Sequence, residues 1–375
     1  MSQRSISYST WTSPHQHQLN APEHKTGPNF LSALTFPNVL TRCWLARNES
    51  GNDDDDDERQ TLLSPSATVP STVTERYGSC IEILHYGTHS CVRLYARKSS
   101  AGHPKQLHVI KVLRRSSNAF VRATHRFEQS LSSAVSHPNL LQTLDVLQND
   151  RGETCLVMDY CAGGDLNTLI ATSGPLLDAS AANCFFKQIM RAVAYLHENA
   201  IAHRALKTEN ILLSARGAVK VADFGDAEWL RDDVTHGIRA ESRLRLQLSS
   251  LYSPPRKMVG SMPYLAPEEL NDCAPVDPRA GDVWAAGLVY MAMRCGRLLW
   301  RTPCADDDGG YRAYLWGRQT YDGYPPIEGL EETHCRNVIY AMLHPDPTRR
   351  IRASEVLRSE WVYDVRVCDA GEMGQ

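Results

Sequence analysis

The sequence predicts an α+β protein of two lobes, a small lobe rich in antiparallel strands followed by a larger, mostly helical lobe. Two observations support this prediction. Between Tyr77 and Tyr160, short runs of β-branched and aromatic residues alternate with Gly, Ser and His-Pro breaks, which is the pattern of antiparallel strands. From Asp178 onward, apolar residues recur at helical spacing. A bilobal arrangement follows from this order.

Five strand-like runs and one helix make up the predicted small lobe. The runs are, in chain order, CIEILHY, CVRLYAR, LHVIKVL, LLQTLDVLQ and TCLVMDY. The helix, HRFEQSLSSAV, lies between the third and fourth runs and ends before His137-Pro138, because a residue that precedes proline disfavours helix. The large lobe begins with the helix ASAANCFFKQIMRAVAYLHENA, and an irregular stretch from about 226 to 265 precedes its last helices.

Composition sets the predicted domain boundaries. The first 74 residues are rich in Ser, Thr, Pro, Asn and His and contain the acidic run Asp53 to Asp57, so they bury too little apolar surface to order and are predicted to be a disordered tail. Ser13 and Ser64 precede prolines and are candidate phosphorylation sites, although ordinary loop composition explains them too. The predicted boundaries are 1–74 for the tail, 75–365 for the domain (small lobe 77–158, large lobe 162–365) and 366–375 for a C-terminal tail.

Charge and cysteine content exclude several functional classes. The formal net charge is −3, and 42% of the residues are hydrophobic, so no basic excess indicates nucleic acid or an anionic membrane as a partner. Eleven cysteines occur without a C-x-x-C pair or zinc-ligand spacing, which favours a reducing compartment. The longest apolar run, Val283 to Met293, has about half the ~20 residues that a membrane span needs. We therefore expect a soluble protein of the cytoplasm or nucleus, with no membrane insertion, and a buried core helix at this run.

A set of motifs occurs in one order along the chain: VIKVL, VMDYCAGGDL, HRALKTEN, ADFGDAE, GSMPYLAPE and DPTRRI. From about Tyr77 to Trp361, the chain resembles the eukaryotic protein kinase domain of the Ser/Thr type. YGSC, VMDYCAGGDL, DVWAAGLVYMAMRCGRLLWR and CRNVIYAMLHPDPTRRI also resemble the fungal kinases linked to halotolerance and nutrient-transporter control. The resemblance implies a bilobal kinase-like fold, ATP and Mg²⁺ as cofactors, and a protein substrate or partner in signalling.

The resemblance also assigns the residues that handle phosphate. Lys111 would hold the α- and β-phosphates of ATP, and Glu128 would pair with that lysine. Asn210 and Asp223 would be the Mg²⁺ ligands, since this hard cation prefers oxygen donors. Lys207 would stabilise the phosphoryl group in transfer, as Ser/Thr-type kinases do.

Further contacts to ATP, and some structural contacts, follow from the same resemblance. Met158 would border the adenine. The other expected cofactor-binding residues are Gly87 and Val92 in the phosphate-covering loop, Asp159 and Cys161 at the adenine, Asp165 at the ribose and Leu212 beneath the base. Three residues would have structural roles in the large lobe: Asp282, which would anchor the HRALKTEN loop, and the pair Glu268 and Arg350.

Two departures from the family pattern affect the predicted chemistry. The base position of the HRALKTEN loop holds Ala205 instead of aspartate, and a general base contributes about 10²- to 10⁴-fold to rate. Glu209 and Asp226 lie near in sequence, but neither occupies the base position. In the phosphate-covering loop, HYGTHSCV, only the middle glycine of the family's three remains: His85 and Ser90 replace the others. Backbone N–H groups approach a phosphate less closely where glycine is lost.

The segment between Gly225 and Ala266 is long for an activation loop and contains Ser249, Ser250 and Ser253 near basic residues. Arg204 could bind a phosphate on that loop, and an unregulated insertion is the alternative.

Three hypotheses remain open for the whole protein. The leading one is a pseudokinase, an ATP-binding kinase fold whose catalysis is impaired because Ala205 leaves the base position vacant. The second is a weakly active or unconventional Ser/Thr kinase that transfers the γ-phosphate of ATP to protein. The third is an interaction scaffold that binds no nucleotide, which the altered glycine loop supports. Binding of ATP separates the third hypothesis from the other two.

Overall fold

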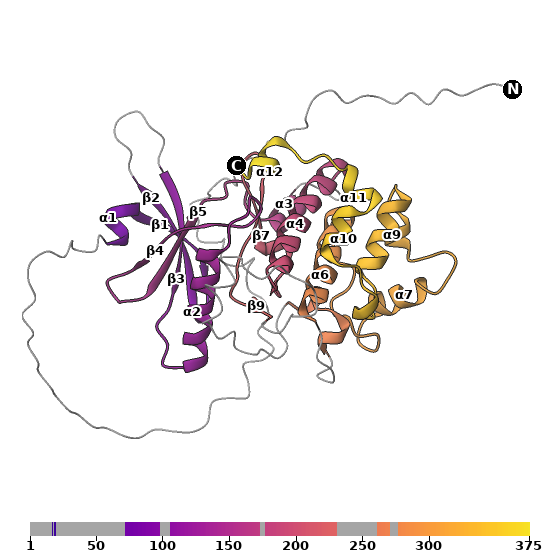
Figure 1. The fold of residues 1–375 in the computed structure, drawn as a ribbon, viewed down its shortest axis with the longest axis horizontal. Coiled ribbons are helices and arrows are strands. Elements are labelled where there is room, and N and C mark those ends of the chain that lie inside the picture. Colours follow the sequence, from indigo (N-terminus) through magenta and orange to yellow (C-terminus); the bar gives the residue numbers. More distant parts are fainter. Residues whose placement is uncertain are drawn as a thin grey trace, which may run out of the picture. The chain divides into compact units, whose positions relative to one another are not determined.

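The computed structural model describes residues 72–97, 106–172, 177–230, 261–270 and 277–375, together with His17 and Leu19. Figure 1 shows these residues as a β-rich small lobe and a helical large lobe, which confirms the α+β prediction. The phosphosite candidates Ser13, Ser64, Ser249, Ser250 and Ser253 lie outside the described residues.

The small lobe contains a five-stranded antiparallel sheet in the order β1-β2-β3-β5-β4. All five strand-like runs of the sequence form these strands. The elements are α1 (Val73–Tyr77), β1 (Ser79–Tyr86), β2 (Ser90–Arg97), β3 (Gln106–Leu113), α2 (Ala119–Ala134), β4 (Thr143–Gln148) and β5 (Thr154–Asp159). Because β3 lies between β2 and β5, its residues have strand neighbours on both sides.

Helix α2 begins earlier than the sequence pattern predicts. Asn118 caps the helix by accepting a hydrogen bond from the Phe120 amide at 2.8 Å. Asparagine is among the residues preferred at the N-cap position of helices. The predicted helix starts only at His125, whereas the observed helix also includes residues 119–124. The helix buries Phe127, Glu128, Leu131 and Ser132, so one charged residue belongs to its packed face.

In its described residues, the large lobe is mainly helical and its strands are short. Its elements are α3 (Leu166–Thr172), α4 (Ala179–Glu198), β6 (Ile201–Ala202), η2 (Thr208–Asn210), β7 (Ile211–Leu213), β8 (Val219–Val221), β9 (Glu228–Trp229), η4 (Met262–Tyr264), η5 (Pro267–Leu270), α6 (Pro278–Cys295), α7 (Gly309–Gly317), α8 (Pro325–Glu328), α9 (Thr333–Met342), η6 (Pro347–Arg349), α10 (Ala353–Arg358), α11 (Glu360–Asp364) and α12 (Asp369–Met373).

Helices α4 and α6 form the centre of this lobe. Both pack against each other, and α6 is buried without interruption from Gly281 to Met293. The prediction of a buried core helix at this apolar run is confirmed, because a helix that is apolar on all sides needs packing partners on all sides. Within the described residues, no helix is long and apolar enough to cross a membrane.

Both ends of the predicted domain differ from the sequence-based boundaries. Helix α1 starts at Val73, inside the predicted tail, and Thr72 and Glu75 cap each other's backbone amides; this is a capping box that the sequence TVTE contains. The predicted C-terminal tail forms α12, with Cys368 and Ala370 buried. His17 and Leu19 also contact the large lobe. These short segments were missed because none has a full apolar repeat.

Candidate active site

Lys111 lies at the centre of the small-lobe sheet. Strand β3 places it between Val92 on β2 and Leu156 on β5. Its ammonium forms ion pairs with Glu128 of α2 and, at 2.7 Å, with Oδ1 of Asp223, which follows β8. The structure therefore brings together three predicted site residues from a strand, a helix and a loop.

The charges of this group fix its protonation at neutral pH. Burial disfavours the ammonium of Lys111, but the carboxylates of Glu128 and Asp223 outweigh burial and raise its pKa. Burial likewise opposes ionisation of Asp223, yet Lys111 lowers the pKa of that carboxyl to about 2. Lys111 is thus a cation and Asp223 an anion. The Asp223 side chain remains 46% exposed, which leaves it open to a ligand.

One carboxylate, that of Asp282, anchors the backbone of the HRALKTEN loop. Asp282 of α6 accepts hydrogen bonds from the backbone amides of His203 and Arg204, both at 2.7 Å, and from His197 Nε2 at 2.9 Å. The expected anchoring by Asp282 is confirmed. Arg204 adopts a left-handed backbone with φ of 61°, a strain of about 1–3 kcal/mol that such anchoring can hold. The contact from His197 was not foreseen, since nothing in the sequence links it to Asp282.

Ala205 occupies a fully formed part of this loop. Its amide donates to His203 Nδ1 at 3.3 Å, and its carbonyl accepts from Asn210 Nδ2 at 2.9 Å. The residue is 8% exposed. The backbone is therefore fixed as a site would require, while the side chain is a methyl group with no acceptor for a proton.

Asn210 and Asp223 are tied together through the backbone. They flank the β7–β8 hairpin, and the Ala222 amide donates to the Asn210 carbonyl at 2.9 Å. Asn210 donates a hydrogen bond from its side-chain Nδ2 to the Ala205 carbonyl. This bond does not use the side-chain Oδ1. An amide oxygen and a carboxylate suit Mg²⁺, so the donor set fits the predicted ion.

Lys207 and Glu209 have contacts on the other side of the loop. Lys207 Nζ reaches Ser261 Oγ at 3.4 Å. Thr208 Oγ1 lies 3.2 Å from Glu209 Oε2 and 2.8 Å from the Tyr264 hydroxyl. The Glu209 carboxylate therefore lies within hydrogen-bonding distance of the Thr208 hydroxyl.

The residues expected at the adenine and ribose lie on connected segments. Asp159 ends β5 opposite His108, Cys161 is half-buried, and Leu212 of β7 forms an isolated bridge with Asp165. Asp165 accepts from both the amide and the hydroxyl of Thr168 at 2.8 Å. It thereby caps α3, a role that its sequence position did not reveal.

The predicted phosphate-covering loop forms the β1–β2 turn. Gly87 donates its amide to the Ser90 carbonyl at 2.9 Å, and Val92 pairs with His85 across the two strands. A Cβ atom on Gly87 would lie 3.2 Å from Nε2 of His85. The imidazole of His85 thus lies against the one glycine that this loop retains.

Comparison with known proteins gives a family for this arrangement. Residues 81–362 match the model of the protein kinase domain. The chain belongs to the protein kinase family.

Relatives of this chain are named as serine/threonine-protein kinases. It is 41% identical over 312 residues to the serine/threonine-protein kinase hal4 of Schizosaccharomyces pombe, covering 82% of this chain and 46% of that protein. It is 41% identical over 304 residues to the serine/threonine-protein kinase HAL4/SAT4 of Saccharomyces cerevisiae, covering 79% and 48%. A probable HAL5-like kinase of Vanderwaltozyma polyspora is 28% identical over 330 residues, covering 79% and 42%. The chain spans about half the length of these relatives.

A second fixed point of the large lobe is the ion pair between Arg350 and Glu268. Arg350 binds Glu268 through two hydrogen bonds of 2.6 and 2.9 Å, and its side chain is 1% exposed. The guanidinium also donates to the carbonyls of His344 and Ala280 and lies over the ring of Trp284. These contacts confirm the expected Glu268–Arg350 pair. A buried guanidinium needs several acceptors, because its charge is otherwise costly to remove from water.

Arg204, the candidate ligand for a phosphate on the activation loop, has carboxylate partners in the structure. Its guanidinium binds Glu228 at 2.6 Å and lies 4.0 Å from Glu269. Burial raises the pKa of Glu269 to about 7, and the Ala266 amide and Arg204 only partly offset it. A phosphate at Arg204 would have to compete with Glu228.

Proposed function

We propose that this kinase-fold chain binds ATP with Mg²⁺ and transfers phosphate poorly or not at all, acting as a pseudokinase in intracellular signalling. The observation that carries the proposal is Ala205, a buried methyl group in a loop whose backbone contacts are otherwise complete. The missing aspartate would orient the substrate hydroxyl and take its proton, a contribution of about 10²- to 10⁴-fold.

The remaining machinery supports nucleotide binding. Lys111, held by Glu128 and Asp223, would bind phosphate oxygens, while Lys207 would face the transferring group. Asn210 and Asp223 would hold the Mg²⁺, which keeps the phosphates bridged and neutralises their charge when bound. The contacts to the nucleoside and the phosphates would come from Gly87, Val92, Asp159, Cys161, Asp165 and Leu212.

A weakly active Ser/Thr kinase is the second candidate. Its support is that the relatives are named serine/threonine-protein kinases and that Lys207 is present. Phosphoryl transfer depends mainly on positioning and electrostatics, so a chain without the base could retain slow transfer to protein Ser or Thr. The third candidate, a scaffold without nucleotide, is supported by the His85 ring against Gly87.

Phosphotransfer from labelled ATP distinguishes the first two candidates. Wild type, Ala205→Asp and Lys111→Met would be compared, with a basic Ser/Thr peptide and the protein itself as acceptors. We expect wild type to match Lys111→Met at background and Ala205→Asp to exceed both by about 10²-fold or more. Wild-type activity clearly above that of Lys111→Met would contradict the pseudokinase proposal and favour the weak kinase.

Nucleotide-dependent stability tests the third candidate. A ligand that binds only the folded state raises the melting temperature, so ATP with Mg²⁺ should stabilise wild type. Asp223→Asn should lose the Mg²⁺-dependent part of this shift, because the amide loses the negative charge that binds the cation. Absence of any shift in wild type would favour the scaffold.

A further inference from the structure

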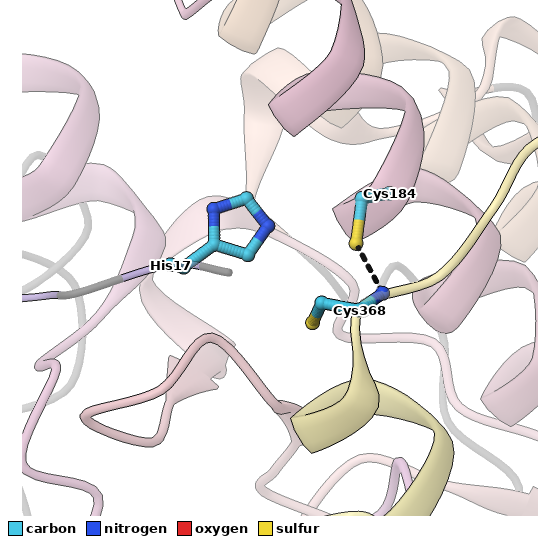
Figure 2. Close-up of side chains that lie close together, drawn as sticks. All are labelled: His17, Cys184 and Cys368. Atoms are coloured by element: carbon cyan, nitrogen blue, oxygen red, sulfur yellow. Dashed lines mark hydrogen bonds between the residues drawn. The ribbon is translucent and has the colours of Figure 1, made fainter. Parts of the chain in front are cut away.

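Outside the kinase site, three potential metal ligands from distant parts of the sequence meet in the large lobe. They are His17, Cys184 of α4 and Cys368, which directly precedes α12. One imidazole nitrogen and the two sulfur atoms all lie within 4.8 Å of one another. Both cysteines are buried, and His17 is half-buried. Figure 2 shows the three side chains gathered at one point from three separate segments.

The position of His17 is built into the fold. The Leu19 amide donates to the Ala215 carbonyl at 2.9 Å, in the turn between β7 and β8. The imidazole packs on the ring of Phe185 at 4.7 Å. At Gly217, where φ is +88°, a Cβ atom would lie 2.6 Å from the His17 ring. A glycine that both adopts a left-handed backbone and leaves room for this ring makes a dedicated place for the histidine.

The two sulfur atoms receive N–H donors. Cys184 Sγ accepts from Gln188 Nε2 at 3.5 Å and from the Cys368 amide at 3.4 Å, and Cys368 Sγ accepts from the Gly371 amide at 3.3 Å. Gln188 is fully buried, and its Oε1 accepts from the Val219 amide at 2.8 Å, which fixes its orientation. Hydrogen bonds of this kind orient and stabilise metal-bound thiolates.

We propose that His17, Cys184 and Cys368 bind one Zn²⁺ ion that fastens the segment around His17 to the large lobe. Two thiolates and an imidazole suit zinc and disfavour Mg²⁺ or Ca²⁺. With Zn–S near 2.3 Å and Zn–N near 2.0 Å, a tetrahedral site separates its two sulfur atoms by about 3.8 Å and each sulfur from the nitrogen by about 3.5 Å. The three atoms, at most 4.8 Å apart, therefore need to close in by at most about 1 Å. A water molecule would complete the tetrahedron.

The proposed zinc site would also brace a segment of the candidate active site. Ala215 and Gly217, which contact the segment around His17, lie in the turn of the β7–β8 hairpin. Asn210 and Asp223 lie at the open end of that hairpin. The ion would hold the turn from one side while the hairpin carries the two predicted Mg²⁺ ligands at the other.

Metal content of the tag-free full chain tests the proposal. After dialysis in metal-free buffer, we expect inductively coupled plasma mass spectrometry to find one zinc ion per wild-type chain. His17→Ala, Cys184→Ser and Cys368→Ser should each bind zinc more than about 100-fold more weakly, since even changes beyond the direct ligands cost about 10- to 100-fold. Cys335→Ser is the matched control, because this buried thiol on α9 contacts Tyr290 instead, and it should keep the metal.

A spectroscopic measurement covers the case in which a cysteine variant fails to fold. Co²⁺ added to metal-free wild type should give thiolate charge-transfer and tetrahedral ligand-field bands, and His17→Ala, which lies outside every helix and strand, should weaken or shift them. Absence of these bands and of bound zinc in wild type would overturn the proposal. So would zinc retained equally by all four variants, or a Cys184–Cys368 disulfide in protein purified without reductant.

Discussion

At position 205 a methyl group stands in a loop that is otherwise held as a catalytic loop would be. Asp282 fixes the backbone before it and Asn210 fixes its carbonyl. One substitution can therefore remove a proton acceptor without removing the architecture around it. The same separation of chemistry from architecture makes Ala205→Asp an informative variant, because the hydrogen bonds of residue 205 come from its backbone and not from its side chain.

Arg350→Lys tests how much the second fixed point of the large lobe contributes to stability. Lysine keeps the charge but cannot reproduce the two-pronged contact with Glu268 together with the bonds to His344 and Ala280. We expect the free energy of unfolding to fall by about 2–3 kcal/mol, measured by chemical denaturation.

Arg191→Lys is the matched control. Arg191 also binds a carboxylate through two nitrogens, at 2.8 and 3.1 Å, but the pair it forms with Glu372 is 30% and 51% exposed. Exposed pairs contribute about 0–1 kcal/mol, so this variant should lose less than about 1 kcal/mol. Equal losses in the two variants would show that burial of the Arg350 pair is not what matters.

At the scale of helices and strands, long elements with a repeating pattern were predictable and short ones were not. The five strands and helix α4, capped at Asp178, were confirmed because alternation or helical spacing extends over many residues. Helices α1 and α12 have five residues each, too few for a repeat. Their signals are caps instead, and their packing depends on partners far away in sequence.

Helix α4 offers a test of capping. The Ala181 amide donates to Asp178 Oδ1 at 2.8 Å, and Asp178→Ala should cost about 1 kcal/mol of unfolding free energy. Glu332→Ala is the control: Glu332 precedes α9 and makes no side-chain capping bond, so its removal should cost less than about 0.5 kcal/mol. Thermal or urea unfolding would measure both; similar losses would exclude capping as the cause.

Across the whole molecule, the sequence predicted those site residues that lie in recognisable motifs and no others. Lys111, Glu128 and Asp223 were assigned from their order along the chain, and the structure brings them into contact. Contacts that have no motif could not be foreseen: His197 with Asp282, Asp165 with Thr168, and His17 with two cysteines. Their partners are set by packing between elements, which spacing in sequence does not encode.

His137, in the segment between α2 and β4, is expected to make the free energy of unfolding depend on pH. Burial first, then Arg191 and Lys220, lower the pKa of His137 to about 4, and its Nδ1 accepts from the Asn139 amide at 3.0 Å. A histidine whose pKa is lowered by folding stabilises the fold above its unfolded value near 6.5, and this contribution is lost as the pH falls from about 6.5 to about 4.

His137→Asn isolates this effect, because asparagine keeps an acceptor and does not titrate. Unfolding free energies of both proteins would be measured between pH 7 and pH 4. Relative to the variant, wild type should lose about 1–2 kcal/mol over this range, once its partial exposure to solvent is allowed for. Parallel pH profiles would assign the loss to other groups.

The burial of Cys368 and Gly371 against α4 has a consequence for the making of the protein. The Cys368 amide reaches Cys184, 184 residues earlier in the chain, and Asn139 reaches the Gly371 carbonyl across 232 residues. At a synthesis rate of about 5–20 residues per second, this face of α4 waits roughly 10–40 s for its covering segment. During that interval the nascent lobe exposes the Cys184 thiol and the apolar surface around it, so we expect a ribosome-associated chaperone to bind at this face of α4.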